Sequence, residues 1–180
     1  MINLQEIENK INDVDILQIF TTDLNGRPVT LQVHAGDIEA FFKKGVGFDG
    51  SSVPGYGTVD DSDKLLIPLP ETFRKVEFNQ ENLGFLIGKI NEEYGERSLL
   101  DPRALLEKVV KQAEDEFGLY FLTAPEHEFF LLTTDEFGKD IHTDNAGYFH
   151  ADPRDKGEVV RKEIVAVLKR CGIQLSLIHI

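Results

Sequence analysis

The fold is decided by residues 16–34, ILQIFTTDLNGRPVTLQVH, which predict a β-hairpin. Residues 16–22 and 28–34 are rich in the β-branched and apolar side chains that favour strands. Between them stands Asn25-Gly26, a dipeptide typical of tight hairpin turns. We therefore expect two antiparallel strands close to the start of the chain.

Helices and further strands are predicted on both sides of this hairpin. Apolar residues recur at helical spacing in residues 4–14 and 36–44. Residues 64–69 and 84–91 carry strand patterns, and residues 73–78 are a candidate for one more strand. This order predicts a small α+β sheet with a helix packed across one face.

Residues 45–63 break the pattern and predict a long irregular loop, with five glycines and one proline. Loops of this length are usually functional or disordered. The loop contains Phe48-Asp49-Gly50-Ser51-Ser52, for which two interpretations are open. Asp49 could close an ordinary turn by accepting backbone N–H bonds. Alternatively, hydroxyl and amide donors keep Asp49 ionised, so that it can bind a cation or accept a proton.

The character of the chain changes near residues 94–101, where we expect a domain boundary. Asp101-Pro102 is typical of a helix start, and apolar residues at helical spacing follow as far as Gly118. A strand is predicted over residues 119–133, a turn at residues 135–138 and an amphipathic helix at residues 157–169. These elements include too few strands to close a sheet, which predicts that the second domain is truncated.

The predicted strand contains APEHEFFLL, residues 124–132, in which two carboxylates interrupt an apolar run. In a strand Glu126 and Glu128 point to the same side, roughly 7 Å apart. Two charges at that distance repel by about 2 kcal/mol at an effective dielectric constant near 20. A divalent cation such as Mg²⁺ or Mn²⁺ would relieve the repulsion. A solvent-facing edge of an amphipathic strand would also accommodate both side chains.

The composition describes an ordinary globular protein of 180 residues, with 41% hydrophobic and 28% charged residues. The net charge of −13 argues against nucleic acid or an anionic membrane as a partner. Cys171 is the only cysteine, so no intramolecular disulfide can form. No signal peptide or membrane-spanning run is evident, and we expect a cytoplasmic location.

Four motifs, taken in order, carry a resemblance to a known family. They are Phe48-Asp49-Gly50-Ser51-Ser52, Ser62-Asp63-Lys64-Leu65-Leu66-Ile67-Pro68, Pro125-Glu126-His127-Glu128-Phe129-Phe130 and Gly147-Tyr148-Phe149. In this order and spacing the chain resembles the amino-terminal portion of type I glutamine synthetase. The resemblance implies a β-grasp amino-terminal domain at residues 1–97, followed by an incomplete catalytic α+β domain at residues 98–174.

The family joins ammonia to glutamate at the expense of ATP, through γ-glutamyl phosphate and with two Mg²⁺ or Mn²⁺ ions per site. By resemblance, Glu126 and Glu128 match metal ligands, one for each ion. Asp49 matches the aspartate that binds ammonium and draws off its proton, with Ser52 beside it, and Tyr148 matches a residue lining that pocket. The resemblance further implies a homo-oligomer of stacked six-membered rings, whose active sites are shared between neighbouring subunits.

Three expectations remain open. A family member runs to more than twice this length, so we expect the 180-residue chain alone to be inactive. Residues 175–180, LSLIHI, resemble a translated transposase adapter and are expected to be non-native. Two alternative functions are a γ-glutamyl-amine or polyamine ligase of the same superfamily, and a non-catalytic protein that binds metal or caps a synthetase ring.

Overall fold

A computed structural model describes residues 4–33, 38–78, 80–147, 151 and 153–175 of the chain. The chain divides into two compact units, Met1–Phe121 and Leu122–Ile180.

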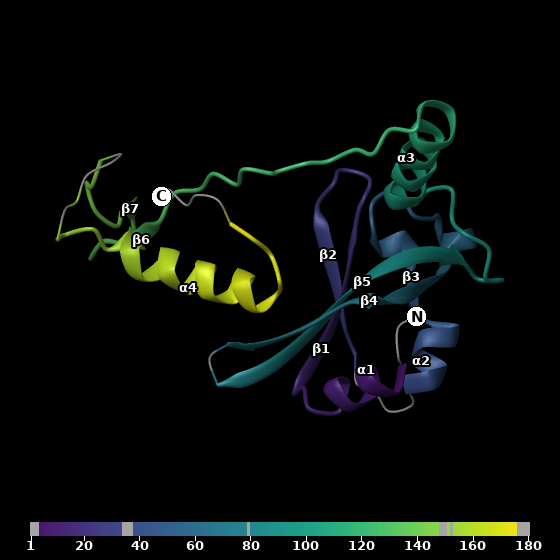
Figure 1. The fold of residues 1–180 in the computed structure, drawn as a ribbon. Helices are drawn as coiled ribbons and strands as arrows, with labels where there is room; N and C mark the ends of the chain where they lie inside the picture. Colours follow the sequence, from purple (N-terminus) through teal and green to yellow (C-terminus); the bar gives the residue numbers. More distant parts are fainter. Residues whose placement is uncertain (1–3, 34–37, 79, 148–150, 152, 176–180) are drawn as a thin grey trace. The chain divides into compact units, whose positions relative to one another are not determined.

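The first unit is built on a mixed five-stranded sheet in the order β2-β1-β5-β4-β3 (Figure 1). The neighbouring strands β1 and β5 run parallel, and the other neighbours are antiparallel. Parallel neighbours require a long crossover, and the chain between β1 and β5 supplies it. The predicted α+β class with a β-grasp-like sheet is confirmed. The strands are β1 (Ile16–Thr22), β2 (Pro28–Val33), β3 (Val46–Asp49), β4 (Asp63–Phe78) and β5 (Glu81–Glu92).

The predicted hairpin is formed by β1 and β2, with Thr22 opposite Pro28 as its last strand pair. The Asp23 carboxylate accepts hydrogen bonds from the backbone N–H groups of Asn25 and Arg27, at 2.8 and 2.9 Å. Gly26 adopts a φ of 75°, a left-handed conformation that glycine tolerates. The turn is one residue longer than the shortest hairpin loop, since the N–H of Asp23 also bonds to the carbonyl of Arg27.

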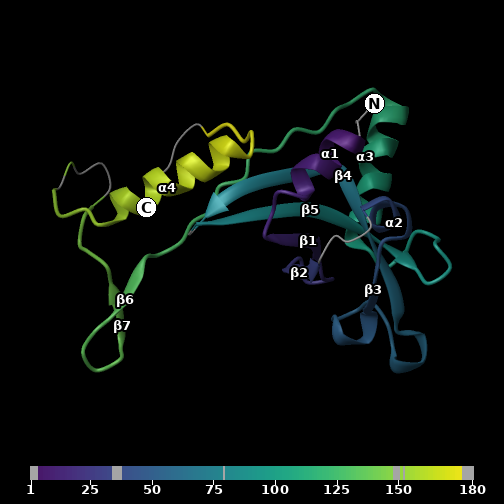
Figure 2. The same cartoon turned by 90° about the horizontal axis from the view of Figure 1, so that it is seen from below.

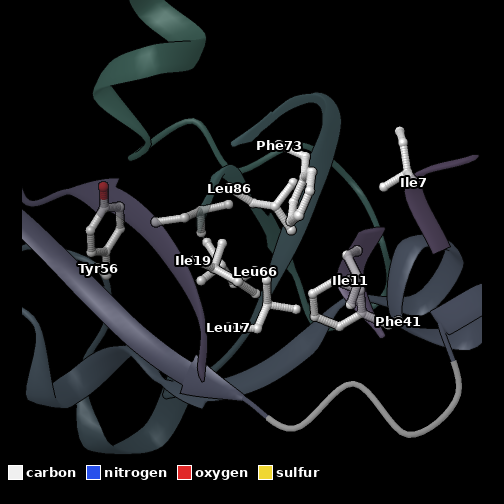
Figure 3. Packing of buried hydrophobic residues seen from close by; sticks show 10 residues of the cluster. Ile7, Ile11, Leu17, Ile19, Phe41, Tyr56, Leu66, Phe73 and Leu86 are labelled. Carbon is white, nitrogen blue, oxygen red and sulfur yellow. The ribbon is translucent and has the colours of Figure 1, made fainter. Parts of the chain in front are cut away.

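Helices α1 (Leu4–Ile11) and α2 (Ile38–Lys44) confirm the two predicted short helices and lie beside the sheet (Figures 1 and 2). Ile7 and Ile11 are one helical turn apart, so both reach the core. Figure 3 shows them packed with Phe41 and with residues of β1, β4 and β5. The buried cluster consists of Ile7, Ile11, Leu17, Ile19, Phe41, Tyr56, Leu66, Phe73, Leu86 and Ile90.

Two sequence predictions need correction in this unit. The segments 64–69 and 73–78 are parts of one strand, β4, whose register against β5 is irregular between Leu69 and Arg74. Pro70 lies inside that interval and has no N–H for the ladder, which accounts for a break in the pairing pattern. The predicted irregular loop at residues 45–63 begins with strand β3 and contains two short 3₁₀ turns, Gly50–Ser52 and Val59–Asp61.

Helix α3 (Pro102–Phe117) starts and ends where the sequence predicts. Asp101 caps it by accepting a hydrogen bond from the N–H of Arg103, and Gly118 ends it with a φ of 63°. No residue of α3 is buried, so its apolar face is exposed in this unit. The larger exposed side chains on it are Leu105, Leu106, Val109 and Phe117.

The second unit contains a two-stranded sheet, β6 (Leu132–Thr134) and β7 (Asp140–His142), and helix α4 (Gly157–Arg170). The turn at residues 135–138 and the second amphipathic helix are confirmed. The predicted strand over residues 119–133 is wrong, since residues 119–131 contain no strand. A strand needs a partner for its backbone groups, and regular pairing begins only at Leu132, opposite His142.

No helix in the described ranges is both long and apolar enough to cross a bilayer.

Candidate functional site

Asp49 lies at the end of β3, where the chain turns into the segment 50–62. Its carboxylate accepts three hydrogen bonds, from the N–H of Ser51 at 2.9 Å, the hydroxyl of Ser51 at 2.6 Å and the hydroxyl of Ser52 at 2.9 Å. These donors favour the charged form, so the Ser51 hydroxyl first, and then Ser52, lower the pKa of Asp49. The carboxylate is exposed and accepts both a backbone N–H and two hydroxyl donors, so both interpretations of Asp49 stay open.

The segment that follows Asp49, residues 50–62, is fastened at its two ends. The N–H of Gly50 donates to the carbonyl of Ser62 over 2.6 Å. A Cβ atom at buried Gly50 would lie 2.7 Å from Cγ of Lys64 and 3.2 Å from the carbonyl oxygen of Tyr56. The backbone here is therefore packed so closely that only glycine fits. This segment is called the Asp49 loop below.

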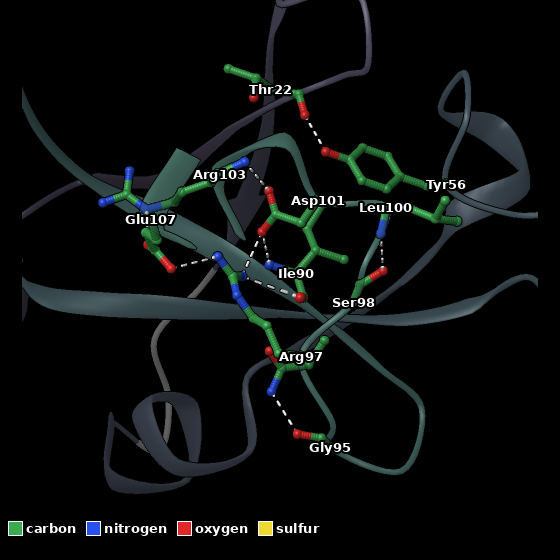
Figure 4. Close-up of polar contacts among 11 residues, drawn as sticks. Thr22, Tyr56, Ile90, Gly95, Arg97, Ser98, Leu100, Asp101, Arg103 and Glu107 are labelled. Carbon is green, nitrogen blue, oxygen red and sulfur yellow. Dashed lines mark hydrogen bonds and ion pairs between the residues drawn. The ribbon is translucent and has the colours of Figure 1, made fainter. Parts of the chain in front are cut away.

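Tyr56 anchors the middle of the Asp49 loop to the sheet. Its side chain is fully buried, and its hydroxyl donates to the carbonyl of Thr22 at the end of β1 (Figure 4). The Phe48 ring stands edge-on to the Tyr56 ring, 6.4 Å between centroids. Burial, and then the negative charge of Asp101, raise the pKa of Tyr56 to about 12. The phenol therefore stays neutral and acts as a structural donor.

A second polar cluster joins β5 to the start of α3. Asp101 is fully buried and accepts hydrogen bonds from the N–H of Ile90 at 2.9 Å and from Nη1 of Arg97 at 2.5 Å. Arg97 also pairs with Glu107 of α3 over 3.2 Å (Figure 4). The Asp101 carboxylate thus accepts hydrogen bonds from the backbone of a strand, from an arginine side chain and from the N-terminus of a helix. The sequence indicated its capping role only.

An open depression of about 430 Å³ lies on β3 and β4. Asp63, which stands opposite Asp49 in the strand register, is one of its lining residues. The other lining residues are Gly47, Phe48, Lys64, Leu65 and Glu93.

The predicted metal ligands Glu126 and Glu128 lie in the second unit, both exposed and outside any helix or strand. Within the described ranges, no three His, Cys, Asp or Glu side chains are grouped so that they could hold a metal ion. Mg²⁺ is coordinated octahedrally by oxygen ligands. The described residues therefore do not form a metal site by themselves, and the assignment of both glutamates stays a prediction.

Of the five predicted site residues, the structure brings Asp49 and Ser52 together. Tyr148 lies outside the described residues, as do residues 176–180 of the proposed non-native tail. The sequence did not single out Lys64 or Tyr56, although both help to hold the Asp49 loop. The available signal was their position: Tyr56 is an aromatic side chain inside a glycine-rich loop, and Lys64 is a cation in an apolar strand.

Comparisons with known proteins show which family has this architecture. The chain matches the β-grasp domain of glutamine synthetase at residues 13–93 and the catalytic domain of glutamine synthetase at residues 99–180. It is 31% identical to the glutamine synthetase of Methanococcus maripaludis, over 94% of this chain and 40% of that protein. It is 32% identical to the glutamine synthetase of Halobacterium salinarum, over 92% of this chain and 37% of that protein.

A glutamine synthetase of Plasmodium falciparum, determined by cryo-electron microscopy, has the same fold with a TM-score of 0.72. That match covers 99% of this chain and 42% of the other, at 18% identity. This chain belongs to the glutamine synthetase family, and it spans about 40% of the length of the curated relatives that it matches.

Proposed function

We propose that this chain is the amino-terminal part of a glutamate–ammonia ligase, which makes glutamine from glutamate, ammonium and ATP. Membership of the glutamine synthetase family supports the class of reaction. The observation that carries the proposal is the Asp49 carboxylate, which Ser51 and Ser52 hold ionised at the end of β3. A permanently charged carboxylate on an anchored loop is suited to binding a small cation.

Asp49 would serve the reaction in two steps. Its charge first selects ammonium over neutral competitors, and it then accepts a proton so that the nitrogen gains a lone pair. The nitrogen attacks the γ-carbonyl carbon of γ-glutamyl phosphate, a C–N bond forms, the C–O bond to phosphate breaks, and the second proton of the nitrogen leaves with the phosphate. Ser52 donates to the Asp49 carboxylate over 2.9 Å and would keep it in a fixed orientation during both steps. Tyr148 is proposed, by resemblance, to line the same pocket.

The roles of the metal ions, of ATP and of the oligomer are proposed as well. Glu126 and Glu128 would each contribute one oxygen ligand to a different Mg²⁺ or Mn²⁺ ion, with other ligands supplied elsewhere in the assembled enzyme. ATP would supply the phosphate of the intermediate. Homo-oligomeric rings would complete each site across a subunit interface. We therefore expect the 180-residue chain by itself to form no glutamine.

The test is the Asp49→Asn substitution in the full-length protein that carries this chain. Loss of a catalytic base typically costs about 10²–10⁴-fold in rate, so ammonium-dependent phosphate release should fall by a factor in that range. Asp60→Asn, in the Asp49 loop and also exposed, serves as the matched control and should retain activity. Unchanged activity in Asp49→Asn would refute the proposed role. A preference for methylamine or polyamines over ammonium would instead favour the γ-glutamyl-amine ligase alternative.

A further inference from the structure

Lys64 is an unusual residue of this unit, because a lysine is rarely buried without a reason. Its side chain is 1% exposed, yet it stands in β4 directly after the Asp49 loop. Its ammonium group lies 2.6 Å from Oε2 of Glu92 and 3.0 Å from Oδ1 of Asp61. The hydrogen bond that Lys64 donates to Glu92, more than any other contact, raises the pKa of Lys64, and the same bond lowers the pKa of Glu92.

The two carboxylates come from parts of the unit that have different constraints. Glu92 ends the central strand β5 and is half-buried, so it is a fixed support. Asp61 ends the second 3₁₀ turn of the Asp49 loop, and its side chain is 75% exposed. An exposed carboxylate gains little from an ordinary surface ion pair. A buried ammonium, in contrast, loses much if a partner leaves, because water cannot replace it.

The stem of Lys64 meets the loop at its other end. Its Cγ atom occupies the space into which a Cβ at Gly50 would project, 2.7 Å away. Gly50 follows Asp49 directly and starts the 3₁₀ turn that carries Ser51 and Ser52. One side chain thus contacts both the first residues of the loop and, through Asp61, its last turn.

We propose that Lys64 is a positioning residue that sets the geometry of the Asp49 carboxylate, by holding the Asp49 loop against the sheet through Asp61 and Glu92. The catalytic consequence rests on the proposed function, whereas the positioning itself does not. The role assigned to Lys64 is structural, since its ammonium already bonds to two carboxylates.

The test introduces Lys64→Met and Asp61→Asn separately into the 180-residue chain. NMR titration of the Asp49 carboxyl carbon measures the pKa of Asp49 in each variant and in the wild type. If the ion-paired cluster acts on Asp49 only through charge, Asp61→Asn removes a negative charge and should leave the pKa of Asp49 unchanged or lower it further. If Lys64 positions the loop, releasing Asp61 loosens the bonds from Ser51 and Ser52, and the pKa of Asp49 should rise. The direction of the shift in Asp61→Asn therefore separates the two explanations.

Amide hydrogen exchange supplies a second readout that depends on loop opening. We expect exchange of the Gly50 N–H to accelerate at least about tenfold in Lys64→Met and Asp61→Asn, because local opening exposes it. Lys64→Arg, which keeps the charge, should restore part of the protection. Lys75→Met is the matched control, since Lys75 is another ion-paired lysine of β4 and pairs with Asp13. It should leave both readouts unchanged.

A lowered or unchanged Asp49 pKa together with wild-type Gly50 exchange in Asp61→Asn overturns the proposal. Should Lys64→Met fail to fold, Asp61→Asn still decides, because it leaves the pair between Lys64 and Glu92 in place. In the full-length enzyme, Lys64→Met should raise KM for ammonium several-fold with KM for ATP unchanged. If Asp49→Asn leaves activity unchanged, the proposed function is refuted, while the NMR result on positioning still stands.

Discussion

The end of β3 and the segment Pro125–Glu128 were both predicted to carry acidic site residues, Asp49 in the first and Glu126 and Glu128 in the second, and their surroundings in the structure differ. Asp49 finds its hydrogen-bond donors two and three residues away, in Ser51 and Ser52. Glu126 and Glu128 have no hydrogen-bond partner among the described residues and stand in a segment without a ladder. A site whose partners are local in sequence is formed by the segment itself, whereas one built on a strand depends on a neighbouring strand.

The same contrast holds for the two units as wholes. In the first, Ile19, Leu86 and Ile90 are completely buried between strands and helices. Among the described residues of the second, only Gly157 and Cys171 are buried. Burial of apolar surface is the main stabilising contribution to folding. The first unit therefore contains the cooperative core, and the second should contribute little to it.

One of the two largest expected effects comes from a pair of leucines that differ in burial. Leu86→Ala removes a fully buried side chain from β5 and should lower the free energy of unfolding by about 2–5 kcal/mol. Leu122→Ala alters a side chain that is 92% exposed and should change it by less than about 0.5 kcal/mol. Urea denaturation followed by far-ultraviolet circular dichroism measures both. Equal effects would mean that the two units share one core.

The next effect tests the polar cluster at the start of α3. Asp101→Ala leaves the buried N–H of Ile90 and the guanidinium of Arg97 without their carboxylate, and it removes the helix cap. Breaking such a buried pair costs about 3–5 kcal/mol. Asp115→Ala, which removes an exposed i,i+4 pair with Lys111, should cost under about 0.5 kcal/mol. A loss no larger than this control in the same urea measurement would show that Arg97 and Ile90 find other partners.

Much of the first unit could be predicted from local pattern. The hairpin followed from Asn25-Gly26 between two strand-like runs, and α3 followed from Asp101-Pro102 and Gly118. Each of these signals is complete within a few residues, so nothing distant has to be known. The class of fold and the approximate place of its elements were accessible for the same reason.

The errors arose where long-range pairing decides. Strand β3 is only four residues long, and it exists because Val46–Asp49 pairs with the start of β4. Residues 119–131 have the composition of a strand but no partner strand in the described part of the chain. Lys64 was overlooked because its burial follows from Glu92, which is 28 residues away. Periodicity alone carries none of this information.

The third prediction uses two glycines of the same region. Gly50→Ala would place a Cβ 2.7 Å from Cγ of Lys64 and 3.1 Å from the carbonyl oxygen of Ser62. Overpacking of this kind costs about 1–3 kcal/mol, and the displaced loop should also raise the pKa of Asp49. Gly47→Ala is the control, because a Cβ there meets nothing within 4 Å. Thermal unfolding compares the two, and equal melting temperatures would show that the loop yields at no cost.

The smallest effect concerns the ionisation of Asp49 itself. The Ser51 hydroxyl is the largest cause of its lowered pKa, so Ser51→Ala should raise that pKa toward the ordinary value of 3.8, and Ser52→Ala should raise it less. Ser62→Ala, which leaves the carboxylate's three donors in place, should not move it. NMR titration of the Asp49 carboxyl carbon gives all three values.

The sign of the accompanying pH dependence follows from the same donors. Because folding lowers the pKa of Asp49, its contribution to stability is complete above the unfolded value of 3.8 and is lost as the pH falls through the lower folded value. In Ser51→Ala the free energy of unfolding should therefore depend less on pH below 3.8 and should depend on pH near neutrality as in the wild type. If the free energy of unfolding of Ser51→Ala depends on acid pH as in the wild type, the hydroxyl hydrogen bonds do not hold the carboxylate in solution. Asp49 would then be no better prepared to bind a cation than the exposed glutamates of the second unit.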